Sequence, residues 1–258
     1  MLDAALGIVE RVGLTVSLEH LSLEEVIRDA GVARSAVYRR WPYKDQFYAD
    51  LLREVARATT PVAVIDDETR LEPLRRTLRG ARGRIRRATD RRELVVELIR
   101  IGASLDFDAI YGSREWRTYL AVHAAVSSLT DSDLRDEVQA LLAQSEERFV
   151  ARLSARYAVL TELLGFQVRK ELDLTLEDLA LLASSTLRGL VLSALARPEL
   201  TNPRHARPTG ASSTKEWTLS GLALLGLVDT FLVYDTQDWP PERAAMVERS
   251  LTEVLSAL

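Results

Sequence analysis

Apolar residues recur at intervals of three and four positions along most of the chain, which is the spacing of one face of an α-helix. No segment alternates between apolar and polar residues for long enough to require a strand. Beyond the amino-terminal segment, the spacing predicts helices over residues 45–59, 93–106, 113–128, 132–165, 175–197, 217–234 and 241–257. We therefore expect an all-α fold.

Residues 22–44 carry the local signals of two helices joined by a tight turn. Ser22 and Glu25 have the spacing of a capping box, so the first helix is expected to begin there. Gly31 is expected to end it, because the residue after a helix often takes a left-handed conformation that costs glycine little. This order of elements is that of a helix-turn-helix.

The second of these helices is predicted to be short. It should begin near Arg34 and end at Pro42, since proline disfavours a helical conformation in the residue before it. Val37 and Trp41 lie four positions apart and are predicted to face inward. The residues left on the outer surface are Arg34, Ser35, Tyr38 and Arg39.

Positive charge gathers around this second helix, although residues 1–58 as a whole hold eight basic and nine acidic side chains. Between Gly31 and Lys44 every charged residue is basic, and these residues are Arg34, Arg39, Arg40 and Lys44. Such a cluster suits contact with DNA phosphates, because affinity there comes mainly from displaced counterions. The alternative is a solvated helix face that binds nothing.

The turn Ala30-Gly31-Val32, the pairs Val37-Tyr38 and Trp41-Pro42, and Lys44 follow one another in this order. The run resembles the DNA-binding domain of TetR-family transcriptional regulators, and the resemblance covers residues 2–58. It implies a three-helix DNA-binding domain over 1–58, followed by a larger helical domain over 59–258 for effector binding and dimerisation. It also implies a homodimer that binds a palindromic operator and is released by a small molecule.

The resemblance further implies which residues contact double-stranded DNA. Tyr38 and Lys44 would bind phosphates, while the other residues would lie in or beside the major groove. The full set is Arg34, Ser35, Ala36, Tyr38, Arg39 and Lys44.

Several features depart from the family pattern. Ala33 stands where the family has a serine that caps the recognition helix, a loss of roughly 1 kcal/mol. Ala36 stands where threonine is common, so one hydroxyl contact to DNA is absent. The connection over residues 14–21 is longer than usual.

Two later segments are apolar on most of their circumference. Residues 175–197 and 217–234 carry leucines in several directions, together with small residues that permit close helix approach. We expect them to form the homodimer interface as a four-helix bundle, as the resemblance also implies. The alternative is a buried helical hairpin within a monomer. The proline- and glycine-containing segment 197–215 between them is expected to be a flexible loop.

Polar aromatic side chains recur at helical spacing near the middle of the chain and suggest a pocket for a small apolar or aromatic effector. These residues are Phe107, Tyr111, Trp116, Tyr119 and His123. The alternative is that they are part of the core. Residues 70–92 are rich in arginine, which indicates either an anion site or a solvated surface paired with nearby acids.

Composition narrows the class of protein further. The 258 residues carry a net charge of −4, so there is no general attraction to nucleic acid, and the absence of cysteine excludes disulfides and thiolate metal sites. The three histidines fall in separate segments, and no glycine-rich phosphate loop is present, so we expect neither an enzyme nor a bound cofactor or metal. With no leader peptide and no long apolar stretch without charge, a cytoplasmic protein without membrane contact is expected.

The function predicted from the sequence is a ligand-responsive DNA-binding transcriptional regulator, expected to be a repressor. Two alternatives stay open. One is a helix-turn-helix scaffold used for protein–protein interaction, and the other is a helical small-molecule-binding protein that does not bind DNA.

Overall fold

The computed structural model describes residues 1–12, 22–63 and 68–257, and within these residues the fold is all-α, as predicted from the sequence. Eleven α-helices and four strands of three residues each occur in the described part of the chain. The long connection noted over residues 14–21 lies outside the described residues.

The chain divides into two compact units that are not consecutive halves. One unit contains Met1–Val62 and Ser113–Phe149, and the other contains Ala63–Gly112 and Val150–Leu258. The compact units therefore differ from the two consecutive segments 1–58 and 59–258, because residues 113–149 pack with the amino-terminal part. Helix α8 (Ser132–Leu164) contributes residues to both units.

The first unit is built from five complete helices and the beginning of α8. The five helices are α1 (Leu2–Val12), α2 (Leu23–Ala30), α3 (Arg34–Arg40), α4 (Lys44–Ala58) and α7 (Arg114–Ser128). They share one apolar core, because each contributes a buried stripe at helical spacing. Core residues from all six of these helices include Ala5, Val26, Val37, Phe47, Leu51, Val122 and Val138.

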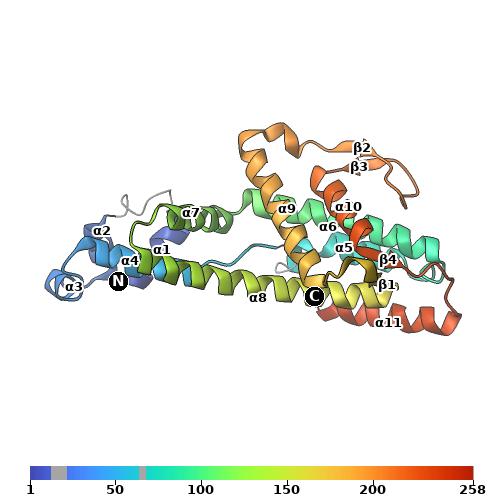
Figure 1. The fold of residues 1–258 in the computed structure, drawn as a ribbon, viewed down its shortest axis with the longest axis horizontal. Coiled ribbons are helices and arrows are strands. Elements are labelled where there is room, and N and C mark those ends of the chain that lie inside the picture. Colours follow the sequence, from blue (N-terminus) through green and yellow to red (C-terminus); the bar gives the residue numbers. More distant parts are fainter. Residues whose placement is uncertain (13–21, 64–67, 258) are drawn as a thin grey trace. The chain divides into compact units, whose positions relative to one another are not determined.

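The second unit is a helical layer structure around α6, against which α9 and α10 pack (Figure 1). Its helices besides α8 are α5 (Glu72–Gly80), α6 (Ala88–Gly112), α9 (Leu176–Ala196), α10 (Leu219–Phe231) and α11 (Pro241–Ala257). Short 3-10 turns lie at Glu68–Arg70, Lys170–Leu172 and Pro198–Thr201.

Two short antiparallel strand pairs correct the sequence reading of this unit. Strand β1 (Phe166–Val168) pairs with β4 (Leu232–Tyr234), so the helix expected over 217–234 ends three residues early. Strand β2 (Arg204–Ala206) lies in the segment 197–215 that was expected to be a flexible loop, and it forms a hairpin with β3 (Lys215–Trp217), which begins at the last residue of that segment. Runs of three residues are too short to give an alternating pattern.

Helix α9 is long and apolar enough to cross a bilayer by length and composition, with a mean hydropathy of 1.7 over 18 residues. It begins at a complete capping box, in which the Thr175 hydroxyl accepts from the Asp178 N–H and the Asp178 carboxylate accepts from the Thr175 N–H. Leu179, Leu187 and Val191 are buried, and the helix packs on α6 and α10. A core helix of this composition meets the same criterion.

The arginine-rich segment 70–92 is neither one anion site nor one solvated surface. Arg91 is only 1% exposed, and its guanidinium donates to four backbone carbonyls at 2.7–3.0 Å while lying 3.8 Å from the centre of the Trp239 ring. Arg92 pairs with Asp229 of α10. Arg79 and Arg84, in contrast, are exposed and pair with acids close in sequence.

Trp239 is also packed against the backbone at Gly165, which follows α8. Gly165 has φ +75°, and a Cβ atom built there would lie 2.7 Å from the Trp239 ring. The indole N–H donates to the Asp235 carboxylate at 2.8 Å, and the Asp235 N–H donates to the Gly165 carbonyl at 2.7 Å. The position therefore requires glycine both for its backbone conformation and for space.

We expect Gly165→Ala to destabilise the protein by roughly 2–4 kcal/mol, because it combines a left-handed alanine with a clash against a buried ring. Gly80→Ala is the matched control, since nothing lies within 4 Å of its added Cβ atom. The control should change stability by less than about 1 kcal/mol. Chemical denaturation followed by circular dichroism measures both, and equal stability of the two variants would contradict the packing described.

Candidate nucleic-acid interface and ligand cavity

The turn between α2 and α3 has the geometry that its residues predict. The Ser22 hydroxyl accepts a hydrogen bond from the Glu25 N–H at 3.4 Å, at the start of α2. Gly31 follows the last residue of α2 with φ 63° and ψ 28°, and its N–H donates to the Arg28 carbonyl at 3.2 Å. The left-handed glycine thus redirects the chain into α3 after a short extended link.

Helix α3 is held in place by its two inward residues. Val37 is 2% exposed and Trp41 is 6% exposed, as predicted from their spacing. The Trp41 indole donates to the Asp50 carboxylate at 2.9 Å, and its ring meets the edge of Phe47 at a centroid distance of 5.3 Å. At the start of the helix, Ala33 offers no side-chain cap. The orientation of α3 therefore depends on tertiary packing.

The outer face of α3 presents the residues that the sequence assigned to DNA. The structure leaves all six side chains exposed on α3 and at the first residue of α4, and they are Arg34, Ser35, Ala36, Tyr38, Arg39 and Lys44. Arg39 and Lys44 form no ion pair with any residue that the structure describes. These two cations are therefore available to an external anion.

Glu24 is a functional candidate that the sequence reasoning missed. It lies on α2, pairs with the Arg34 guanidinium and accepts a hydrogen bond from the Tyr38 hydroxyl at 3.3 Å. Although no acid lies between Gly31 and Lys44 in sequence, the fold brings this one to the cationic face. The sequence signal that could have indicated this contact is the position of Glu24, an acid in the first turn of the helix that precedes α3.

The five aromatic residues proposed for an effector do not form one group. Trp116, Tyr119 and His123 lie on α7 in the first unit. The Trp116 and Tyr119 rings stack with centroids 4.9 Å apart, and the His123 ring is tilted on Tyr119 at 4.0 Å. The Tyr119 hydroxyl donates to Glu146, and His123 Nδ1 lies 2.9 Å from the Tyr119 carbonyl oxygen. Trp116 and Tyr119 are buried, so this set packs as part of the core of its unit.

The other two aromatic residues, Phe107 and Tyr111, stack at 5.8 Å near the end of α6 in the second unit. Neither they nor the three on α7 are among the residues that line the cavity found in the second unit, as described below. The aromatic spacing indicated packing within a helix and did not identify the wall of this cavity.

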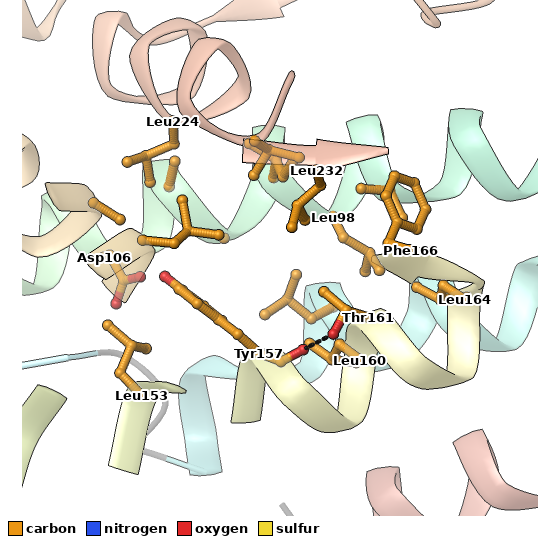
Figure 2. Close-up of a pocket in the computed structure, with 18 of the residues that line it drawn as sticks. Leu98, Asp106, Leu153, Tyr157, Leu160, Thr161, Leu164, Phe166, Leu224 and Leu232 are labelled. Atoms are coloured by element: carbon orange, nitrogen blue, oxygen red, sulfur yellow. Dashed lines mark hydrogen bonds between the residues drawn. The ribbon is translucent and has the colours of Figure 1, made fainter. Parts of the chain in front are cut away.

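The second unit contains a cavity of about 230 Å³ that is enclosed by α5, α6, α8, α9 and α10, with β1 and β4 at one side (Figure 2). Its wall consists mainly of leucine, isoleucine and valine side chains. Polar side chains in the wall are limited to Arg75, Asp106, Tyr157 and Thr161. Such a composition is typical of a site for a largely apolar small molecule.

The polar groups meet at one end of the cavity. Figure 2 shows the Tyr157 ring with its hydroxyl directed toward the Asp106 carboxylate, away from Leu164 and Phe166. Burial, reinforced by the charge of Asp106, raises the pKa of the Tyr157 phenol, so it stays protonated at neutral pH. The Thr161 hydroxyl is already bonded to the Tyr157 carbonyl at 2.8 Å.

Two donors at this cavity lack a partner among the described residues. The Tyr157 hydroxyl makes no hydrogen bond to them, and the buried Arg75 Nε has no acceptor among them. Arg75 Nε is buried, and a buried donor without a partner is costly. Tyr157 is half-buried, and its hydroxyl is directed into the polar end of the cavity (Figure 2). Sequence reasoning missed them because Arg75, Asp106 and Tyr157 come from three different helices.

No family model matches the chain, and comparisons with curated proteins and with solved structures find no match. Within residues 1–12, 22–63 and 68–257, no group of three or more histidine or acidic side chains is placed to hold a metal ion. The exposed face of α3 and the cavity of the second unit are the two features that indicate a function.

Proposed function

We propose that this protein is a cytoplasmic, ligand-responsive transcriptional regulator of the TetR type, a repressor that binds a palindromic operator as a homodimer and is released by a small molecule. The observation that carries the proposal is the outer face of α3. There a short helix, fixed by Val37 and Trp41 and set by the Gly31 turn, presents Arg34 and Arg39 beside Lys44 at the start of α4, and Arg39 and Lys44 are without an ion pair to the described residues. A helix held in this way after a tight turn is suited to the major groove.

The residues of this face would divide their roles by chemistry. Tyr38 and Lys44 would contact phosphates, which position the protein without reading sequence. Arg34, Ser35, Ala36 and Arg39 would face the base edges, where a guanidinium can bond two acceptors of guanine and the Ala36 methyl can meet a thymine methyl. Selectivity would therefore rest mainly on the arginines.

The homodimer is supported by the outer face of α9 within segment 175–197. Four leucines on this helix are 43–53% exposed, and they are Leu181, Leu182, Leu192 and Leu195. Gly189 on α9 and Gly226 on α10 have no atom within 4 Å of an added Cβ, which leaves room for a neighbouring helix. A second copy that packs 175–197 and 217–234 across a twofold axis would cover this apolar surface.

Release from DNA would follow from ligand binding in the cavity of the second unit. A ligand shifts the equilibrium only as far as its affinities for the DNA-competent and the released conformations differ. The effector site is placed in this cavity because its wall is apolar and carries unpartnered donors.

One observation favours the alternative of a scaffold for protein–protein contact. Glu24 already occupies Arg34 and Tyr38, two of the six residues assigned to DNA. A mobility-shift assay with the DNA flanking the gene separates the two functions. Salt-sensitive, sequence-selective binding supports the regulator, whereas no binding together with a protein partner caught by pull-down supports the scaffold.

Arg39→Ala and Lys44→Ala should weaken DNA binding in different ways. Arg39→Ala should lower affinity for the operator by about 1–3 kcal/mol and relax sequence preference. Lys44→Ala should weaken binding to all sequences and reduce the slope of log affinity against log salt by about 1. Fluorescence anisotropy with operator and scrambled duplexes over a salt series measures both, and identical behaviour of the two variants would refute the division of roles.

Glu24→Gln should increase affinity for DNA by about 3- to 10-fold at low salt, because it frees Arg34 and removes a negative charge close to the phosphates. Glu25→Gln is the matched control, since Glu25 lies on the same helix and pairs with Arg28. The gain should shrink as salt is raised. An unchanged or lower affinity of the Glu24 variant would argue against DNA contact by Arg34.

Leu192→Glu should weaken the homodimer by about 100-fold, because it buries a charge within the proposed interface. Val159→Glu on α8 is the control, as Val159 is 42% exposed and lies outside the segments assigned to the interface. Sedimentation equilibrium of both variants and the parent chain gives the dimer affinities. A parent chain that is monomeric at all concentrations, or equal effects of the two variants, would exclude this interface.

A further inference from the structure

We propose that the cavity of the second unit binds a neutral, elongated hydrocarbon that carries one hydroxyl or carbonyl oxygen near one end. This inference rests on the proposed function only in taking the ligand to be its effector. The chemistry of the ligand follows from the cavity wall.

The arrangement of apolar side chains along the cavity wall indicates that the ligand's apolar part is extended. Apolar side chains from five helices continue from Leu153 at the polar end to Leu98, Leu164 and Phe166 at the other end (Figure 2). Burying the ligand's hydrocarbon in this cavity is favourable in proportion to the apolar area removed from water. Polar groups along the apolar part of the ligand would find no hydrogen-bond partner in the wall. The ligand therefore has one polar end and one extended apolar part.

The ligand's lack of charge follows from the charges in the wall. Among the residues that line the cavity, the charged ones are Arg75 and Asp106, whose formal charges cancel. A carboxylate or an ammonium group would bring a net charge into an apolar enclosure that does not balance it. Such burial is expensive, so a neutral head group is favoured.

The ligand's oxygen follows from the unpartnered atoms. Both the Tyr157 hydroxyl and Arg75 Nε can donate a hydrogen bond, and neither has an acceptor among the described residues. A hydroxyl or carbonyl oxygen would accept from them. A hydroxyl could in addition donate to the Asp106 carboxylate, toward which the Tyr157 hydroxyl points.

Isothermal titration calorimetry with the full chain tests this chemistry directly. The probes are 1-decanol, 2-decanone, decanoate, decylamine and the oxygen-free n-hexylbenzene. We expect the alcohol and the ketone to bind at least about 10-fold more tightly than decanoate and decylamine. Tightest binding of either charged probe would overturn the neutral head group, and no preference for the alcohol and the ketone over n-hexylbenzene would overturn the role of the oxygen.

Two variants tie the binding to this cavity. Tyr157→Phe should weaken 2-decanone by about 3- to 10-fold and leave n-hexylbenzene unchanged, because it removes one hydrogen bond while keeping the ring. Ala183→Phe, which fills the cavity from α9, should abolish binding of all probes. Ala158→Phe is its control, since the same change is made at an exposed position next to Tyr157. Unaltered binding by both Tyr157→Phe and Ala183→Phe would place the ligand elsewhere.

The same probes, added to a protein–DNA complex, separate this inference from the proposed function. Binding by calorimetry without DNA binding or release would uphold the ligand chemistry and reject the regulator. Sequence-selective DNA binding with no calorimetric binding of any probe would uphold DNA recognition and reject the ligand chemistry.

Discussion

The second unit depends on one buried cation, the Arg91 guanidinium stacked on Trp239. Burial lowers the pKa of this guanidinium, and the charges of Asp235 and Asp238 act in the opposite direction. The guanidinium donates to four backbone carbonyls, from Ile85, Arg86, Asp235 and Gln237. Those carbonyls belong to the connection before α6 and the connection before α11. Without Arg91, several carbonyls of these connections would lose a donor at once. Two further hydrogen bonds join the same connections, from the Trp239 N–H to the Arg86 carbonyl and from the Ala88 N–H to the Asp238 carboxylate.

This cluster also explains why the second unit could be predicted only in outline. Helical spacing was enough to predict the all-α class and the approximate places of α6, α9, α10 and α11, although α6 extends beyond the predicted 93–106 at both ends. The strand pairs β1–β4 and β2–β3, and the burial of Arg91 within an arginine-rich run, depend on residues that are nine or more positions apart in sequence. Arginines of equal appearance in sequence became a core residue, an ion pair and a solvated side chain, and no local pattern distinguishes these outcomes.

The two candidate sites also differ in how far they could be predicted from local sequence. The signals of the α2–α3 turn are local, since a cap, a left-handed glycine and an inward pair lie within 20 residues, and the structure confirms each of them. The cavity has no local signal because its wall is assembled from helices spread between residues 71 and 232. The aromatic spacing on α7 instead reflects ring contacts within one helix, where Trp116 and Tyr119 are buried and His123 is half-buried.

Glu24 gives the proposed DNA-binding face a property that its sequence alone does not reveal. Any DNA group that reaches Arg34 must replace a carboxylate already paired with it, so part of the electrostatic gain is lost at every DNA sequence. The net charge of −4 acts in the same direction. Under the proposed function, non-specific binding would therefore be weak, and the contacts of Arg34 and Arg39 to base edges would have to supply the difference at the operator. An acid on the supporting helix would thus favour selectivity over affinity.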